Sequence, residues 1–378
     1  MRMLVLGAGL QGTACAFDLL RNAAVSHVTL ADVQVAALPP FLQAVAGARL
    51  SQQALDVRDA IAVRAQFAQC DAVCSAIPYF FNRSLAELAV AAGVHFADLG
   101  GNTEIVRQQQ LLNDAAIGKG VSVVPDTGLA PGMVNIIAQF GITQFDAVDR
   151  VQLFVGGLPQ APEPPLGYQI AYSIEGMVDY YTTPSLVVRD SVPTEVTALS
   201  EIETVMFDAP LGALEAFHTA GGLSTMVYRY AGRIPNMEYK TLRYPGHARI
   251  MAAIRDLGLL EKTPVDVKGQ QVVPRDVFVR VAGDKLQKRK PDLVAVRVVV
   301  SGTRNGVRAT RAWEVVDYYD AALGITAMMR TTGFTLSITS QMQATGVIGA
   351  GVHTPDECVP AEEYIAALAE RGVMVREV

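Results

Sequence analysis

Short runs of apolar residues alternate with longer helical segments through the first 145 residues of the chain. The apolar runs are continuous, as expected for strands of a parallel sheet that is covered on both faces. The segments between them carry apolar residues at helical spacing, as in Ser84–Ala92 and Ile105–Lys119. This alternation predicts an α/β fold with a doubly wound parallel sheet. The expected strands are Met3–Leu6, Val28–Ala31, Leu50–Leu55, Ala72–Ala76, Val94–Ala97 and Val121–Val124.

The pattern changes after about Phe145. Pro159–Pro165 is a proline-rich stretch that the interior of a parallel sheet would not tolerate. Strand-like runs then follow one another, and Asn305-Gly306 between the last two is a strong hairpin signal. We expect a second α+β domain built on a largely antiparallel sheet. Its strand candidates are Val196–Leu199, Val205–Phe207, Tyr239–Tyr244, Leu293–Ser301 and Val307–Val316.

Helical periodicity returns near the end of the chain, in Ala327–Thr345 and Ala361–Arg371. Helices there could pack back on the first domain and make it discontinuous in sequence. We therefore expect residues 1–130 and 326–378 to form a nucleotide-binding domain, and residues 131–325 to form the catalytic and dimerisation domain.

Composition excludes several classes of protein. The chain has 378 residues, of which 18% are charged, and a net charge of −6. Apart from the short stretch Lys285–Lys290 it has no basic run, so we expect no nucleic-acid partner. No apolar run approaches the ~20 residues of a membrane span, so we expect a soluble, cytoplasmic protein without a membrane partner. The cysteines lack metal-ligand spacing, which predicts free thiols and no metal. They are Cys15, Cys70, Cys74 and Cys358.

The first expected strand runs directly into a glycine-rich turn, GAGLQG, and a helix follows. Gly7 allows the tight turn, Gly9 lets a pyrophosphate approach the backbone, and Gly12 lets helix and strand pack closely. The helix N-terminus then presents unpaired N–H groups to the phosphates. This arrangement predicts a Rossmann dinucleotide site with Gly7, Gly9, Leu10, Gln11 and Gly12 as cofactor-binding residues.

Asp32 ends the second expected strand, 20 residues after Gly12. Its carboxylate would accept hydrogen bonds from the adenosine ribose hydroxyls and would repel a 2′-phosphate. The following Val33-Gln34 supplies no arginine to bind such a phosphate, so we expect NAD rather than NADP. Asp56, at the end of the third strand, is a weaker candidate for contact with the adenine edge, and a helix N-cap is its alternative role.

The ends of the later strands carry further candidates, because ligands of an open α/β sheet lie at the carboxyl ends of its strands. Ala76, Ile77 and Pro78 are expected to border the nicotinamide, with Tyr79 as a weaker substrate contact.

The next two strand ends are rich in glycine, and each contains an acid. We expect Gly100 to contact the cofactor. Asp98 and Asp126 are candidates to hold the substrate amine or to activate water. A role in capping a loop is open for either acid.

Several motifs occur along the chain in a fixed order: GAGLQG, IPYFFN, HFADLGG, VPDTGLAPGMVN, GGLPQAPEPPL, EAFHTAGGLST and YKTLRYPGH. With these motifs the chain resembles the saccharopine reductase-like dehydrogenases over nearly its whole length, and within them the lysine 6-dehydrogenases. The resemblance implies a Rossmann domain completed by C-terminal helices, a central catalytic domain, and a homodimer. It also implies NAD-dependent oxidation of the ε-amino carbon of L-lysine. The product would be 2-aminoadipate 6-semialdehyde, which cyclises to piperideine-6-carboxylate, with release of ammonia.

One departure from the family bears on the substrate. Saccharopine reductase typically has a D-P-G turn followed by a histidine, where this chain has Ala130-Pro131-Gly132 and Asn135. This argues against saccharopine, whose extra carboxylates need more cationic partners, but it does not by itself prove lysine. Two alternatives stay open: an oxidoreductase of the family that acts on another amine, and an NAD-binding protein without turnover.

Oxidation of an amino acid's amine requires groups that hold the substrate carboxylate. Arg243 is the best candidate, because it precedes the start of a helix at Pro245-Gly246-His247. Strand alternation places Thr241 and Arg243 on one face and Lys240 on the other, so Lys240 and Arg243 share a pocket only if the strand is irregular. An ion pair at a domain surface is the alternative for both.

The reaction also requires groups that move protons. His218 and His247 are candidate general bases, because a histidine titrates near neutral pH. A structural role is equally open for each. Thr219 follows His218 and could contact the substrate, a small amino acid, while Glu215 and Glu175 are weaker candidates.

Overall fold

The computed structural model describes residues 1–170, 174–287 and 290–378. The chain divides into two compact units. Unit 1 comprises Met1–Gln144, Ser224–Arg229 and Tyr319–Arg376, and unit 2 comprises Phe145–Leu223, Tyr230–Tyr318 and Glu377–Val378. Both units are thus discontinuous in sequence. Lys288 and Arg289 of the basic stretch lie outside the described residues.

The observed units differ from the expected ranges at four places. Three segments expected in the second domain belong to unit 1: residues 131–144, which include helix α7 (Met133–Ile142), Ser224–Arg229 and residues 319–325. Glu377–Val378, expected in the first domain, belong to unit 2. The apolar face of α7 is buried, with Met133 and Val134 among its fully covered residues, so its packing places it in unit 1.

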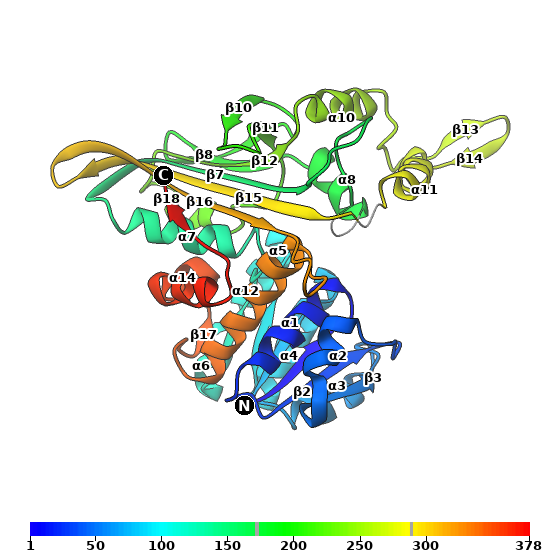
Figure 1. Cartoon of the computed structure of the whole chain (residues 1–378), viewed down its shortest axis with the longest axis vertical. Helices are drawn as coiled ribbons and strands as arrows, with labels where there is room; N and C mark the ends of the chain where they lie inside the picture. The colour runs from blue at the N-terminus through cyan, green and yellow to red at the C-terminus, as the bar shows by residue number, and fades with distance from the viewer. Residues whose placement is uncertain (171–173, 288–289) are drawn as a thin grey trace. The chain divides into compact units, whose positions relative to one another are not determined.

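Unit 1, which contains the N-terminal strands β2 and β3 labelled in Figure 1, is built on a parallel sheet. Its strand order is β3-β2-β1-β4-β5-β6-β17. The first six strands follow the 3-2-1-4-5-6 order of dinucleotide-binding sheets, so the predicted doubly wound fold is confirmed. The strands are β1 (Arg2–Leu6), β2 (His27–Asp32), β3 (Leu50–Ala54), β4 (Ala72–Ser75), β5 (His95–Asp98), β6 (Ser122–Val124) and β17 (Gly351–Val352).

Helices cover the sheet of unit 1, and the long C-terminal helix α12 (Ala327–Ala344) packs against α1 (Leu10–Arg21). At their crossing a Cβ on Gly333 would lie 2.7 Å from the Cβ of Ala14, so only glycine allows this close approach. The helical stretch expected at Ile105–Lys119 is broken into two helices, α5 (Thr103–Gln110) and α6 (Asn113–Lys119). The further helices of unit 1 include α2 (Pro40–Ala46), α3 (Ala60–Phe67), α4 (Asn82–Ala92), α13 (Pro355–Cys358) and α14 (Ala361–Glu370).

Unit 2 contains a mixed sheet in the order β10-β11-β12-β7-β15-β16, with β8 and β9 attached through β12 (Figure 1). Its pairs are antiparallel except β12–β7, which confirms a largely antiparallel α+β unit. The strands are β7 (Ala147–Pro159), β8 (Ser185–Arg189), β9 (Val192–Val196), β10 (Glu203–Met206), β11 (Ala213–His218), β12 (Asn236–Arg243), β15 (Asp292–Arg304) and β16 (Val307–Tyr318).

The local predictions for unit 2 were partly right. Asn305 and Gly306 have φ angles of 51° and 74° in the turn between β15 and β16, as the predicted hairpin requires. The strand expected at Val196–Leu199 was wrong, because β9 ends at Val196 and Leu199 has a φ of 61°, in the left-handed region.

Three helices form a core with one face of this sheet, around the buried side chains of Phe217, Tyr181 and Met251. A separate two-stranded hairpin, β13–β14, lies in the sequence between α10 and α11. These elements are α8 (Ile174–Thr182), α10 (His247–Asp256), β13 (Val265–Val267), β14 (Gln270–Val272) and α11 (Pro274–Leu286). Among the described residues, no helix combines the length and the apolar character that a membrane crossing needs.

Candidate functional site

The glycine-rich loop between β1 and α1 is shaped to hold a phosphate group. Gly7 has a φ of 95°, and a Cβ on Gly12 would lie 1.8 Å from the carbonyl oxygen of Gly7. Around Gly9, by contrast, a Cβ would meet nothing within 4 Å. Gly9 is the N-cap of α1, so the N–H groups of the first helical turn, which includes Leu10 and Gln11, have no partner within the helix. The tight turn and the open N-terminus fit a pyrophosphate.

Asp32 ends β2 beside this loop. Its Oδ2 accepts a hydrogen bond of 2.7 Å from the backbone N–H of Ala8, and Oδ1 accepts a longer one of 3.4 Å from Gln34. An ionised carboxylate has about four acceptor positions, so it keeps lone pairs for further donors. The half-buried carboxylate is therefore fixed in orientation and can still accept hydrogen bonds from a pair of ribose hydroxyls.

The exposed carboxylate of Asp56 is paired with its neighbour Arg58. Both of its oxygens accept hydrogen bonds from the Arg58 guanidinium, at 2.6 to 3.0 Å. This pairing lowers the pKa of Asp56 to about 2. The alternative of a helix N-cap was wrong, because the N-cap of α3 is Asp59, whose side chain accepts from Ile61 and Ala62. Contact with the adenine edge stays a prediction.

The residues after β4 contact the glycine-rich loop. A Cβ on Gly7 would lie 2.7 Å from the carbonyl oxygen of Ala76 and 2.9 Å from Cγ2 of Ile77. Pro78 then leads into a 3₁₀ turn that begins at Tyr79. The predicted nicotinamide-bordering residues therefore lie next to the predicted phosphate loop, within unit 1.

Asp98, at the end of β5, is buried and doubly bound. Its Oδ1 accepts from the N–H of Gly100 at 2.8 Å, and Oδ2 accepts from Nε2 of Gln109 at 2.7 Å. Burial raises the pKa of Asp98 to about 6. Since both oxygens hold the chain that follows β5, the geometry suits the loop-capping alternative better than a reacting group.

Asp126, just after β6, differs from Asp98 in one respect that matters for chemistry. Its Oδ2 accepts a short hydrogen bond from the hydroxyl of Ser224, but its buried Oδ1 has no partner among the described residues. Its backbone is in the left-handed region, with a φ of 63°. Burial raises the pKa of Asp126 to about 7, the Ser224 hydrogen bond lowers it, and the charge of Asp98 raises it. The carboxyl group can thus exchange a proton near neutral pH.

In unit 2, the register of β11 and β12 separates the predicted residues onto two faces. His218 pairs with Lys240, while Phe217 pairs with Thr241 and Glu215 pairs with Arg243. Cross-strand partners share a face, and successive residues alternate. Lys240 and His218 therefore lie on one side of the sheet, and Thr241 and Arg243 on the other.

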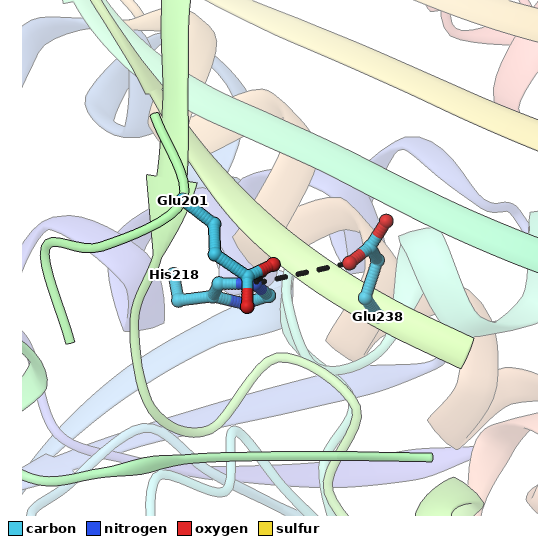
Figure 2. Close-up of side chains that lie close together, drawn as sticks. All are labelled: Glu201, His218 and Glu238. Carbon is cyan, nitrogen blue, oxygen red and sulfur yellow. Dashed lines mark hydrogen bonds and ion pairs between the residues drawn. The ribbon is translucent and has the colours of Figure 1, made fainter. Parts of the chain in front are cut away.

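The first face carries a cluster in which a buried histidine lies between two glutamates (Figure 2). Nε2 of His218 is 3.0 Å from Oε2 of Glu201 and 3.8 Å from Oε2 of Glu238. Burial lowers the pKa of His218, so the ring is neutral at physiological pH. The atoms that could hold a metal ion lie within 4.8 Å of one another. We call these residues the Glu201–His218–Glu238 triad.

Cationic side chains of unit 2 already neutralise this triad. Arg189 donates to Glu238 at 2.6 Å and to Glu201 at 3.1 Å through the same nitrogen, Nη2. Lys240 donates to Glu203 at 2.6 Å and to the carbonyl oxygen of Glu201 at 2.8 Å. A metal ion would have to compete with the Arg189 guanidinium for both carboxylates, so the donor set does not favour a metal.

The opposite face carries the remaining polar candidates around Arg243. This side chain is buried and lies 4.7 Å from the ring centre of Tyr168, in cation–π geometry, and it donates to the carbonyl oxygen of Leu242. The hydroxyls of Thr219 and Thr241 are hydrogen-bonded to each other at 2.7 Å. A cation buried beside hydroxyl groups suits recognition of a carboxylate.

His247 and Glu215 have structural partners. The two ring nitrogens of His247 lie 2.9 Å from the hydroxyl of Tyr181 and 3.1 Å from the carbonyl oxygen of Leu166. Burial, together with the nearby charge of Arg243, lowers the pKa of His247 to about 3. Both nitrogens are thus engaged in hydrogen bonds, which fits the structural role left open for His247 better than the role of a general base. Glu215 accepts from the first N–H groups of α10, at Gly246 and Ala248.

Cavity size does not identify the site. An apolar groove of about 770 Å³ between α10, α11 and the β13–β14 hairpin is lined by none of the predicted site residues among the described ones. A smaller polar hollow of about 490 Å³ includes Lys240 and the two glutamates of the triad. The candidate site is therefore identified from the chemistry of its side chains and not from the volume of a cavity.

Two family models and two curated relatives that match this chain carry the description of saccharopine dehydrogenase. The family model "Saccharopine dehydrogenase NADP binding domain" matches residues 3–124, and "Saccharopine dehydrogenase C-terminal domain" matches residues 128–373. The chain is 26% identical to saccharopine dehydrogenase [NADP(+), L-glutamate-forming] of Saccharomyces cerevisiae over 295 residues, which are 72% of this chain and 60% of that protein. It is 29% identical to the protein of the same description from Pyricularia oryzae over 219 residues, 54% of this chain and 47% of that one.

A solved structure extends the comparison to the fold. Apo saccharopine dehydrogenase (L-Glu forming) from Saccharomyces cerevisiae matches with a TM-score of 0.81 at 20% identity, covering 100% of this chain and 99% of that one. The sequence matches to the curated relatives span about half to three fifths of those proteins' own length.

Proposed function

The chain belongs to the saccharopine dehydrogenase family, and we propose that it catalyses the NAD-dependent oxidative deamination of L-lysine at its ε-amino group. The products are 2-aminoadipate 6-semialdehyde and ammonia. One observation supports the proposal: the Gly7–Gly12 loop makes a tight turn into an open helix N-terminus, and the N–H of Ala8 in this loop holds the Asp32 carboxylate, which would meet the ribose of a dinucleotide bound there. When bound there, the nicotinamide accepts the hydride that leaves the ε-carbon.

Asp32 is the reason for proposing NAD, although the family model and the yeast and Pyricularia relatives are described with NADP. A 2′-phosphate would place its negative charge beside this carboxylate. The next two residues, Val33 and Gln34, offer no cation to compensate for that repulsion.

Lysine is proposed because a buried cation, Arg243, lies on the same face of the sheet as Thr241, whose hydroxyl is bonded to that of Thr219. Arg243 would bind the α-carboxylate of an amino acid in a bidentate manner. At the turn where saccharopine reductase typically has an aspartate and then a histidine, Asn135 accepts a hydrogen bond of 2.7 Å from the N–H of Gly132 and helps to start α7. No charge is added there, which suits a substrate with one carboxylate rather than the three of saccharopine.

The expected homodimer and cytoplasmic location are part of the proposal. All four cysteines are free in the structure, which suits a reducing compartment. Light scattering on the purified protein would measure the oligomeric state.

The proposed function is tested by following absorbance at 340 nm with purified protein, NAD⁺ and L-lysine at about pH 9–10, where more of the ε-amine is neutral. We expect reduced cofactor to form with lysine, and with NAD⁺ in preference to NADP⁺. Ornithine and saccharopine serve as competing substrates. Turnover of one of them but not of lysine would change the substrate and keep the reaction. Cofactor binding without turnover of any amine would favour the non-catalytic alternative.

A further inference from the structure

We propose that Asp126 accepts the proton of the substrate ammonium group and that Ser224, from the segment Ser224–Arg229, is the positioning residue that holds its carboxylate. This inference rests on the proposed function and names the group that makes the amine reactive. Ser224 was not among the residues expected from the sequence.

The position of Asp126 fits a group that faces a ligand. It follows β6 at the carboxyl edge of the parallel sheet, the same edge that carries the Gly7–Gly12 loop and the turn after β4. Ligands of doubly wound sheets bind at this edge. The backbone at Asp126 has a positive φ, a conformation of higher energy that is often found at functional sites.

Packing fixes the carboxylate in one orientation. A Cβ on Gly100 would lie 1.9 Å from Oδ1 of Asp126, so only a glycine leaves room for that oxygen. Oδ2 is held by the Ser224 hydroxyl. One oxygen is thus anchored, and among the described residues Oδ1 makes no hydrogen bond of good geometry, although the N–H of Gly101 lies close enough to the carboxylate to lower its pKa. Burial of an acceptor without a good partner is unfavourable, and a donor on a bound ligand would remove that cost.

The segment that supplies Ser224 is itself held at three further points within unit 1. Nδ2 of Asn135 is 3.1 Å from the sulfur of Met226, and Arg107 lies over the ring of Tyr228 with 5.1 Å between the guanidinium carbon and the ring centre. Arg229 donates to the buried Asp356 at 2.8 Å. These contacts give Ser224 a defined place although it is 98 positions from Asp126 in the chain.

The groups around Asp126 shift its pKa in opposite directions. Burial and the charges of Asp98 and Asp356 raise the pKa of Asp126, whereas hydrogen bonds from Ser224 and from the N–H of Gly101 lower it. Arg229 is paired with Asp356 and partly offsets that charge.

Three of the other candidates have partners at the atoms that would take a proton. Both oxygens of Asp98 and both ring nitrogens of His247 are hydrogen-bonded, and Lys240 is bound to Glu203. His218 belongs to unit 2 and is bound to Glu201 through Nε2, while its buried Nδ1 has no partner among the described residues. Asp126 combines a buried oxygen of the same kind with a position at the carboxyl edge of the nucleotide sheet.

The Asp126 carboxylate takes one proton from the ε-ammonium group, and the N–H electron pair becomes the nitrogen lone pair. This lone pair forms the C=N bond as the C–H bond breaks, and the hydride leaves with its two electrons to NAD⁺, the named oxidant. Water then adds to the iminium carbon, and one of its protons moves to the nitrogen. The C–N bond breaks, its electron pair leaves with ammonia, and the oxygen forms the C=O bond and loses its remaining proton to solvent.

The test compares wild type with Asp126→Asn, Ser224→Ala and Ser224→Thr, using L-lysine and NAD⁺. Asp126→Asn keeps the shape and an acceptor for Ser224, and we expect kcat to fall about 10²- to 10⁴-fold while the Kd for NAD⁺ is unchanged. Ser224→Ala removes a hydrogen bond to the carboxylate. The acid limb of the pH profile of kcat/KM should therefore move to higher pH, giving roughly three- to tenfold lower activity on that limb and little change at high pH. Ser224→Thr should restore the profile.

Ser84→Ala, which removes an exposed hydroxyl of the same unit, is the matched control and should leave the profile unchanged. Turnover by Asp126→Asn within about threefold of wild type would overturn the role of Asp126 while the proposed function stands. An unmoved acid limb in a folded Ser224→Ala protein would overturn the role of Ser224. If wild type itself oxidises no amine, the proposed function fails and this inference fails with it.

Discussion

The backbone N–H of Ala8 donates a hydrogen bond of 2.7 Å to Oδ2 of Asp32, so the loop proposed to hold the pyrophosphate also orients the carboxylate proposed to select the ribose. The first prediction concerns this link. Asp32→Ala together with Gln34→Arg should lower the ratio of kcat/KM for NAD⁺ to that for NADP⁺ by roughly 10- to 100-fold, because it removes a charged acceptor and adds a phosphate-binding cation.

Steady-state kinetics with both cofactors measures this ratio. Gln53→Ala, on the exposed end of the neighbouring strand β3, is the control. An unchanged ratio in the double variant would remove Asp32 from the ribose site.

Arg243→Lys should raise the KM for L-lysine by roughly tenfold or more, because a lysine cannot make the bidentate contact with a carboxylate. The substrate itself supplies the control. 1,5-Diaminopentane has the same amine but no carboxylate, so its kinetics should be nearly equal in wild type and variant. An equal loss with both substrates would assign Arg243 to structure, through its packing on Tyr168.

Asp98 should make the protein less stable as the pH rises from about 4 to about 6. Its pKa is about 6 when folded, against a usual value of 3.8, so in this range the folded chain binds a proton that the unfolded chain has released. Asp98→Asn removes this dependence, and Oε1 of Gln109, which has no partner among the described residues, can accept from the new amide. The variant should gain up to about 3 kcal/mol relative to wild type over this range.

Urea unfolding between pH 4 and pH 7 measures this difference. Asp56→Asn provides a contrast of opposite sign. The pKa of Asp56 is lowered to about 2, so its contribution to stability is present above pH 4 and is lost only as the pH falls towards 2. A difference between wild type and Asp98→Asn that does not vary with pH would contradict the assigned pKa.

Arg189→Met should destabilise the protein by about 3 kcal/mol, because it leaves the carboxylate of Glu238 buried without its cation. The matched control is Arg308→Met, which removes an exposed ion pair with Asp149 and should cost less than about 1 kcal/mol. Chemical denaturation of the two variants tests this. Equal effects would mean that the pairing of Glu238 contributes little.

Removal of divalent metal should leave the protein unchanged. The Glu201–His218–Glu238 triad has a cation in place, the Arg189 guanidinium, so dialysis against EDTA should alter neither the Tm nor the rate of cofactor reduction. A loss of Tm that added Zn²⁺ restores in wild type, but not in His218→Ala, would identify the triad as a metal site.

Elements that depend on local pattern were predictable from the sequence. The apolar strands of unit 1, the glycine loop and the Asn305-Gly306 hairpin each follow from a short stretch of residues whose pattern is typical of one local structure. Alternation along β12 also predicted that Lys240 and Arg243 lie on opposite faces, as the register confirms. The strand expected at Val196–Leu199 failed because its apolar residues enter a turn with a left-handed residue.

What the sequence could not supply are contacts between distant segments. Nothing local to Ser224 indicates a partner 98 positions away, and the EAFHTAGGLST motif drew attention to His218 and Thr219 instead. His247 has the residue type of a base, but only the fold shows that Tyr181 and Leu166 occupy both of its nitrogens. Asp56 was equally ambiguous until its neighbour Arg58 was seen to bind it.

The packing of α12 on α1 has a consequence for the order in which the protein folds during synthesis. Ser337 donates to the buried Asp18 over a separation of 319 positions, and Arg371 donates to the same carboxylate. When residues 1–144 leave the ribosome, one face of their sheet and the buried side of α1 still lack this covering helix, so an apolar surface stays open until residues 327–371 have emerged. The first part of unit 1 therefore waits for its later part while the main segments of unit 2 are made, and during that interval the open surface has to be protected from aggregation.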